Sequence, residues 1–280
     1  MTEEKAIEIR RINKGKRLNI KGGIVLDGFP STGLVNAIAS ECLIRSIGTE
    51  LVAVLDSPYF PPVSIINNYV PQYPARIYVN EGLKVSFFIS ELNIDMSIQK
   101  AVAKTILEWT IDNECRLIIS AEGIVSPAAS HHDGESSTIS NGDNKYYNKG
   151  ESKNDSKDVI VNENISKPEE VFAVSSTLSA ARIIKEYENH FTHLRSGSVT
   201  GIPAILLNEG TLRNLDVIVF LVNALKDIPD FRAAAIVSQA VSRVIPNLSC
   251  DIGSLFIEAE LIGNKIKNVR DNQARLSYIG

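Results

Sequence analysis

The sequence is poor in cysteine and contains no long apolar run. Its three cysteines, Cys42, Cys115 and Cys250, are far apart and form no Cys-x-x-Cys pair. Scattered cysteines in odd number are typical of free thiols, so we expect three buried thiols in a cytoplasmic protein. No apolar run approaches the roughly 20 residues that a membrane helix needs. The charged start, MTEEKAIEIRR, is unlike a signal peptide.

Positive charge is also in deficit. The chain carries 29 lysines and arginines against 33 aspartates and glutamates, which gives a formal net charge of −4. Proteins that bind nucleic acid generally present a basic patch on a basic domain, so this composition argues against nucleic acid as a partner. Hydrophobic residues make up 44% of the 280 residues, the ordinary share for a globular protein.

Common motifs of catalysis and metal binding are missing as well. The chain has no Gly-x-Ser-x-Gly and no His-Glu-x-x-His. His131 and His132 lie in a polar stretch without a third ligand at a useful spacing. Acids follow predicted strands at Asp56, Glu91 and Glu122, but the sequence alone pairs none of them as acid and base. We therefore expect no catalytic residue, no metal and no cofactor.

The chain is organised around residues 22–48. The short apolar run at 24–26 predicts a buried parallel strand, and a Gly-x-Pro sequence ends it. Ser31 or Thr32 is expected to cap the helix that follows, and Gly48 stands where that helix ends. A strand that leads through a glycine turn into a helix is the opening of a βαβ unit.

The turn in this stretch is similar to two phosphate-binding motifs and matches neither. From Gly28 to Gly33 the glycine spacing is that of a P-loop, but Leu34 and Val35 stand where lysine and a hydroxyl residue are required. The dinucleotide fingerprint needs glycine where this chain has Pro30, which offers no N–H to a pyrophosphate. The sequence favours a tight turn in which Gly33 permits close packing, and a small-ligand cleft beside it is the alternative.

Further strands and helices follow in an α/β order. A hairpin with a glycine turn is predicted over 7–20, and a second hairpin over 76–89 with its loop at 80–82. Asp95 and Pro229 each begin a predicted helix. Further strands are predicted at 51–55, 116–120, 171–174 and 216–222, and a helix at 179–189.

The segment Asp56–Pro62 predicts a stiff loop at the end of a strand. Its three prolines cannot continue a strand, and Tyr59 and Phe60 stand among them. In open α/β sheets such loops carry ligand or partner contacts. A rigid surface corner is the alternative, and the sequence does not decide between them.

The domain organisation follows from composition. Residues 1–250 are expected to form a single α/β domain, interrupted at about 128–168 by a polar insert too poor in apolar residues to order itself. Residues 251–280 are expected to form a C-terminal helix and a flexible tail. The apolar stripe from Leu255 to Val269 predicts either a contact between copies of the chain or packing on its own domain.

With these pieces in order, the chain resembles the proteasome assembly chaperone 2 family, including its archaeal members. The matching segments are GFPSTGLV at 28–35, DSPYFPP at 56–62, PARIY at 74–78, GIPAILL at 201–207, and IPD at 228–230 with paired alanines at 233–234. The match covers roughly Leu18 to Val269 apart from the insert.

The resemblance implies a three-layer α/β/α fold with a mixed, largely parallel sheet, similar to nucleoside phosphorylases but without their catalytic groups. It implies an ATP-independent, non-enzymatic chaperone or adaptor that binds α-subunits of the proteasome core particle, often as a homo-oligomer. The alternative function is a small-ligand-binding protein or enzyme with a nucleoside-phosphorylase-like cleft near Gly28–Gly33.

The same resemblance names candidate partner contacts. These are Tyr59 and Phe60 in the strand-end loop, and Leu276, Tyr278 and Ile279 at the end of the chain. Some members of the family end in a hydrophobic-Tyr-any tail that enters pockets between α-subunits. Here the tyrosine is third from the end, so the tail departs from that pattern.

Overall fold

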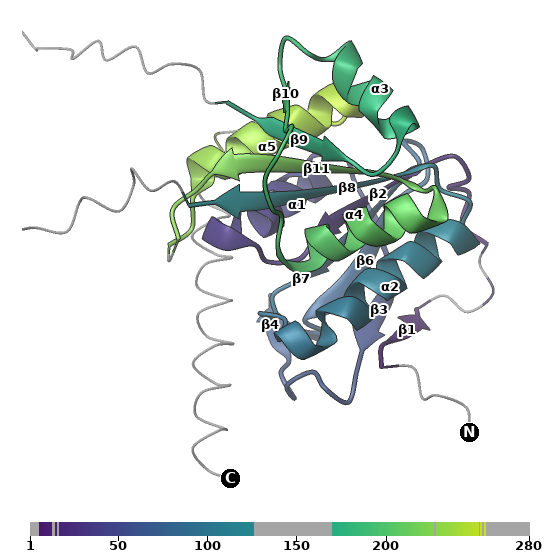
Figure 1. The fold of residues 1–280 in the computed structure, drawn as a ribbon. Coiled ribbons are helices and arrows are strands. Elements are labelled where there is room, and N and C mark those ends of the chain that lie inside the picture. Colours follow the sequence, from purple (N-terminus) through teal and green to yellow (C-terminus); the bar gives the residue numbers. More distant parts are fainter. Residues whose placement is uncertain are drawn as a thin grey trace, which may run out of the picture.

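A sheet lies at the centre of the fold, with helices on both of its faces (Figure 1). The computed structural model describes residues 6–12, 15, 17–125, 170–226, 228–251, 253 and 255. Its strands are β1 (Glu8–Arg11), β2 (Ile24–Gly28), β3 (Glu50–Asp56), β4 (Ile65–Asn67), β5 (Val70–Gln72), β6 (Ala75–Asn80), β7 (Val85–Ser90), β8 (Leu117–Ile124), β9 (Phe172–Ser175), β10 (Thr192–His193) and β11 (Asp216–Asn223). Nine of these strands form one sheet in the order β1-β3-β6-β7-β2-β8-β11-β9-β10, and β4 pairs with β5 in a separate two-stranded sheet.

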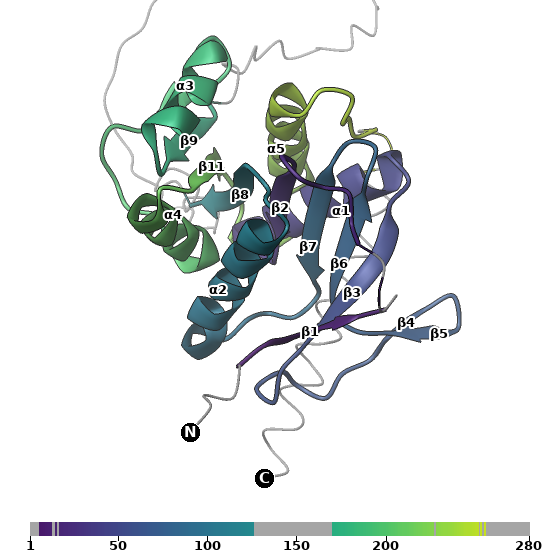
Figure 2. The same ribbon diagram turned by 90° about the vertical axis from the view of Figure 1, so that its right-hand side faces the viewer.

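The helices cover both faces of the large sheet. They are the 3-10 helix η1 (Thr32–Leu34) and the α-helices α1 (Val35–Ser46), α2 (Met96–Asp112), α3 (Leu178–Glu186), α4 (Gly201–Arg213) and α5 (Phe231–Val244). One apolar core joins the sheet to α1, α3 and α5, and a second joins it to α2 and α4. Figure 2 shows α1 and α5 on one side of the sheet and α2 and α4 on the other. The predicted three-layer α/β/α fold is confirmed.

The sheet is mixed, and its central strands are parallel. β2 pairs in parallel with β7 and with β8, and β8 pairs in parallel with β11. β6 is antiparallel to both β7 and β3, so β3 runs in the same direction as β7. The carboxyl ends of β2, β3, β7, β8 and β11 therefore lie at one edge of the sheet, the edge at which α/β proteins carry their contact loops.

The hairpin predicted over residues 7–20 is wrong. β1 pairs antiparallel with β3, with Glu8 opposite Asp56, and residues 18–20 belong to no strand. Ile7 and Ile20 are nevertheless buried, because the two segments reach the core separately. Local alternation identifies buried residues but does not identify the strand that pairs with them. The hairpin over 76–89 is confirmed, but its loop is residues 81–84 and not 80–82, because Asn80 pairs with Val85.

The prediction of three free thiols is also wrong, because Cys42 and Cys250 form a disulfide. Cys42 lies on α1, and Cys250 follows α5, which packs beside α1 on the same face of the sheet. This packing brings their Cα atoms to 5.5 Å although 208 positions separate them in the sequence. Cys115 is the one free cysteine, and burial raises the pKa of its thiol to about 11.

Several predictions concern residues outside the described ranges. The insert at about 128–168, the C-terminal helix and tail, and most of the stripe from Leu255 to Val269 fall there, so they stay predictions. Leu255 itself is described, and it is buried in the core beneath α1 and α5. At this residue the chain packs on its own domain. Among the described residues, no helix combines the length and apolarity required to span a membrane.

Candidate functional site

The turn after β2 is held by two buried acids. Asp27 accepts hydrogen bonds from the Phe29 backbone N–H at 3.1 Å and from the Ser120 hydroxyl at 2.7 Å. Glu122, near the end of β8, accepts a hydrogen bond from the Thr32 backbone N–H at 2.9 Å. The two acids are 1% and 9% exposed. These bonds join the ends of two neighbouring strands, β2 and β8, to one turn.

Burial raises the pKa of both acids. The pKa of Asp27 rises to about 6 because burial disfavours its charged form, although the bonds from Ser120 and Phe29 oppose the rise. Burial likewise raises the pKa of Glu122, against the opposing hydrogen bond from Thr32. Acids with raised pKa values at strand ends are candidates for chemistry. Here each carboxylate oxygen of Asp27 accepts a hydrogen bond from within the protein, and Glu122 accepts one from Thr32. The role of both acids in holding the turn therefore explains their burial.

The glycines at this edge permit close packing. Gly33 has a φ of +66°, and a Cβ there would lie 2.8 Å from the Leu225 carbonyl oxygen. Its own carbonyl accepts a hydrogen bond of 2.8 Å from the Asp230 N–H at the start of α5. A Cβ at Gly123 would collide with the Thr32 carbonyl oxygen. The segment that leads into α5 thus packs directly against the turn, which favours close packing over a phosphate cradle.

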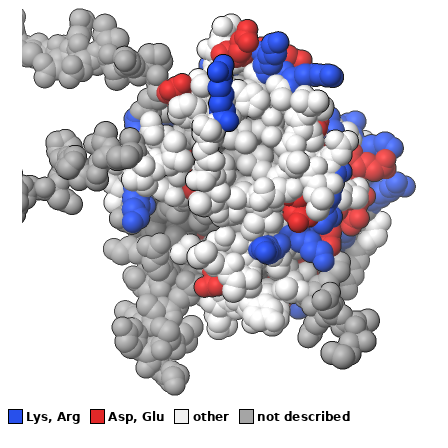
Figure 3. Space-filling view, in the orientation of Figure 1, with Lys and Arg blue, Asp and Glu red and all other residues white. Residues whose placement is uncertain are grey.

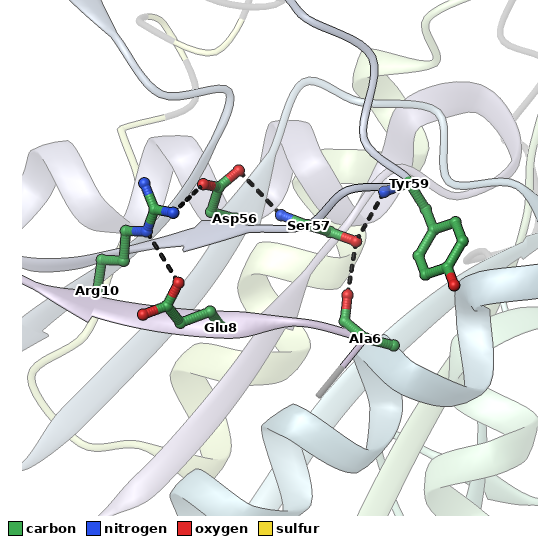
Figure 4. Close-up of polar contacts among 6 residues, drawn as sticks. All are labelled: Ala6, Glu8, Arg10, Asp56, Ser57 and Tyr59. Atoms are coloured by element: carbon green, nitrogen blue, oxygen red, sulfur yellow. Dashed lines mark hydrogen bonds and ion pairs between the residues drawn. The ribbon is translucent and has the colours of Figure 1, made fainter. Parts of the chain in front are cut away.

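The loop after β3 carries the two aromatic residues predicted to contact a partner. Tyr59 is 66% exposed, whereas Phe60 is half-buried and packs against the cluster that contains Leu92. The Ser57 hydroxyl donates to the Ala6 carbonyl at 2.6 Å and accepts from the Tyr59 backbone N–H at 3.2 Å (Figure 4). The two adjacent aromatic residues therefore differ in role: Phe60 anchors the loop, and Tyr59 is exposed to solvent.

Charged residues border this loop on its β1 side. Arg10 forms ion pairs with Asp56 at 2.8 Å and with Glu8 at 3.0 Å (Figure 4). Asp56 also accepts a hydrogen bond of 2.9 Å from the Ser57 backbone N–H. Exposed ion pairs of this kind contribute little to stability, because water screens both charges. Their effect here is to join strand β1 to the start of the loop.

A buried ion pair that the sequence did not reveal fixes the other side of this region. Arg76 on β6 lies 2.6 Å from Glu91, just after β7, and both side chains are at most 4% exposed. Arg76 also donates to the Tyr73 carbonyl at 2.9 Å, and Glu41 of α1 lies 3.7 Å away. Burial of both partners makes this a strong constraint on where the chain before β6 can lie. The arginine within the Pro-Ala-Arg-Ile-Tyr motif was its only local signal.

The remaining predicted contacts, Leu276, Tyr278 and Ile279, lie outside the described residues. The structure therefore brings Tyr59 and Phe60 together in one loop and leaves the tail residues as predictions. Within the described part of the chain, no group of three or more His, Cys, Asp or Glu side chains is arranged to hold a metal ion.

Comparison with known proteins identifies the family. The model of the PAC2 family matches residues 25–270. The chain belongs to the PAC2 family. An uncharacterized protein of Methanocaldococcus jannaschii is 22% identical over 260 residues, which cover 93% of this chain and 90% of that protein.

Solved structures of PAC2-like proteins share the fold. Pyrococcus furiosus PbaA, described as an archaeal homolog of proteasome-assembly chaperone, matches with a TM-score of 0.68 and 22% identity, covering 96% of this chain and 99% of that chain. Pyrococcus furiosus PbaB, described as an archaeal proteasome activator, matches with a TM-score of 0.65 and 21% identity, covering 95% and 100%. These TM-scores show a common fold, whereas the similarity to nucleoside phosphorylases stays a prediction.

Proposed function

We propose that this PAC2 protein is an ATP-independent assembly chaperone or adaptor that binds α-subunits of the proteasome core particle. The observation that carries the proposal is the family match over residues 25–270, together with the fold shared with PbaA. The proposal includes a cytoplasmic location and a homo-oligomeric state. It assigns partner contacts to Tyr59, with Phe60 as the anchor of its loop, and to Leu276, Tyr278 and Ile279 in the tail.

The described side chains support a role in binding rather than chemistry. The buried acids at the carboxyl edge hold a backbone turn, and the exposed aromatic ring of Tyr59 lies at the same edge. Tyrosine is enriched among residues that dominate protein–protein binding, because it presents a large apolar ring with one polar end. A holding function needs such a surface and needs no nucleotide.

The test is binding of the purified full-length protein to recombinant α-subunits of the same organism. We expect a Kd in the micromolar range or tighter that is the same with and without ATP. Tyr59→Ala and a deletion of residues 276–280 should each weaken binding. Leu212→Ala is the matched control, since Leu212 is a large apolar side chain, 80% exposed, on helix α4. Absence of binding by the full-length protein at micromolar concentration would contradict the proposal.

A small ligand near Gly28–Gly33 is the second candidate function. The observation behind it is the raised pKa of Asp27 and of Glu122, because perturbed acids at strand ends often accompany binding sites, although hydrogen bonds to the turn also account for both acids here. A thermal-shift series with nucleosides and nucleotides tests it, since a ligand at a hundredfold excess over its Kd stabilises the folded state by about 2.7 kcal/mol. No shift across the series would remove this candidate.

A further inference from the structure

The β4–β5 hairpin is an exposed, uncharged element; residues 65–72 are named here the arm. Residues 57–75, which include the arm, contain no aspartate, glutamate, lysine or arginine, although such residues make up 22% of the chain. Large apolar side chains in this region are exposed to solvent: Tyr59 66%, Ile66 64%, Tyr69 100%, Val70 56% and Tyr73 43%. In Figure 3 charged side chains gather over α3 and at the right-hand margin. Exposed apolar patches of this kind mark interaction sites.

The arm is anchored at its base and is free of the large sheet. Ile65 is buried against Leu92 in a small cluster joined by Phe60, whereas the next residue, Ile66, points to the opposite face and is exposed. Among the described strands, β4 and β5 pair only with each other, and Figure 2 shows them extending outward beyond β3. The Arg76 side chain donates hydrogen bonds to the Gln72 side chain and to the Tyr73 carbonyl, and so fixes the segment that leads from β5 to β6. The base thus fixes the direction in which the tip projects.

The tip of the arm has an unusual residue in a demanding conformation. Asn67 pairs with Val70, so the turn has two central residues, Asn68 and Tyr69. Their φ values are +48° and +65°, as in a type I′ turn. The second position of this turn is usually glycine, because a side chain is disfavoured at positive φ. Tyr69 is fully exposed, so no packing within the described chain offsets that cost. A disfavoured conformation that presents an aromatic ring to solvent points to a role in binding.

We propose that the arm inserts into an uncharged apolar groove on the proteasome α-subunit, with Tyr69 at the tip and Ile66 and Val70 on its flanks. This inference rests on the proposed function and names the surface that performs it. An arm without charge matches an uncharged groove and offers nothing to phosphates or to anionic headgroups. The paired Arg10 and Asp56 beside the neighbouring loop complete an apolar centre with a polar rim, the usual anatomy of a protein–protein interface.

The experiment compares α-subunit binding by the full-length wild-type protein and by arm variants. Tyr69→Gly places the preferred residue in the turn, so we expect an unchanged or higher melting temperature together with a Kd at least tenfold weaker, about 1.4 kcal/mol. Ile66→Ser should also weaken binding to the α-subunit. Leu212→Ala removes an equally exposed apolar side chain outside the arm and should leave the Kd unchanged.

The outcomes separate the two proposals. Wild-type binding that Tyr69→Gly and Ile66→Ser both retain at full strength overturns the inference about the arm and leaves the proposed function standing. Absence of binding by the wild-type protein overturns both. Two other results, each with unchanged α-subunit binding, also overturn the inference. A lower oligomer mass of the arm variants by light scattering would show that the arm contacts a second copy of the chain. Arm-dependent binding to phosphatidylcholine vesicles would show that the arm contacts a membrane.

Discussion

Asp27 makes the stability of the fold depend on pH in a defined direction. Burial raises its pKa from 3.8 to about 6 in the folded protein. Between these values the folded protein keeps a proton that the unfolded chain has lost, so the free energy of unfolding falls as pH rises. This contribution is fully present below about pH 4 and is lost once pH exceeds about 6. A difference of about two pKa units corresponds to about 3 kcal/mol.

Asp27→Asn removes the titration and keeps most of the contacts. The amide oxygen can still accept from the Phe29 backbone N–H, and the amide nitrogen can donate to the Ser120 hydroxyl oxygen. We expect the free energy of unfolding of the variant, relative to wild type, to rise by about 3 kcal/mol between pH 4 and pH 7.5. Other groups titrate in both proteins, so the difference between them isolates position 27.

Urea unfolding followed by circular dichroism at several pH values measures this difference. Asp95→Asn supplies a control of opposite sign, because a hydrogen bond from Ser97 lowers the pKa of the Asp95 carboxyl group. Asp95 therefore contributes stability that is lost as pH falls. A stability difference between Asp27→Asn and wild type that stays constant across pH would refute the reasoning about burial.

Three further predictions concern the framework of the fold. Arg76→Ala leaves the buried Glu91 without its closest cation and should lower the free energy of unfolding by about 3–5 kcal/mol in urea titrations, whereas a loss below about 1 kcal/mol would show that the pair is solvated. Cys250→Ser removes the disulfide and should lower the free energy of unfolding by about 2–5 kcal/mol in protein purified without reductant. Dithiothreitol should lower the free energy of unfolding of the wild-type protein to the same value. Equal stability of the wild-type protein with and without reductant would contradict this prediction. Deletion of residues 130–158 should leave the melting temperature unchanged. Strands β8 and β9, which flank the deleted residues, both pair with β11, with Ile124 opposite Asn223 and Phe172 opposite Leu221. The end of β8 and the start of β9 therefore lie at the same edge of the sheet, only about 10 Å apart. A large fall in melting temperature would show that the deleted segment is structural.

The elements that could be predicted from the sequence are those with local signals. Asp95 accepts the capping bond from Ser97 at 2.8 Å, as predicted. The helix predicted to begin at Pro229 begins instead at Phe231 and is capped by Asp230, which accepts from the Ala233 N–H at 2.9 Å. Helical spacing and a capping side chain lie within a few residues of each other, so one window of sequence contains both. The strand, glycine turn and helix over residues 22–48 were predicted from local spacing. The predicted cap at Ser31 or Thr32 is wrong, because the N-cap position of α1 is occupied by Leu34, which makes no side-chain capping bond.

The parts that could not be predicted depend on contacts between distant segments. The bond from Ser120 to Asp27 joins residues 93 positions apart, and the disulfide joins residues 208 apart. The arm was missed because its strands are three residues long, and Pro71 interrupts the pattern. At the site, the sequence placed Tyr59 and Phe60 in the correct loop, but only the packing around Leu92 shows that one is an anchor and the other is presented.

The disulfide between Cys42 and Cys250 has a mechanical consequence. It ties the chain into a covalent ring that contains every strand of the large sheet except β1 and β2, and all of the described helices except η1 and most of α1. A force applied to either end of the chain can extend only the residues outside this ring. A machine that unravels proteins as a single thread would therefore stall at the crosslink, and a reducing agent would release it.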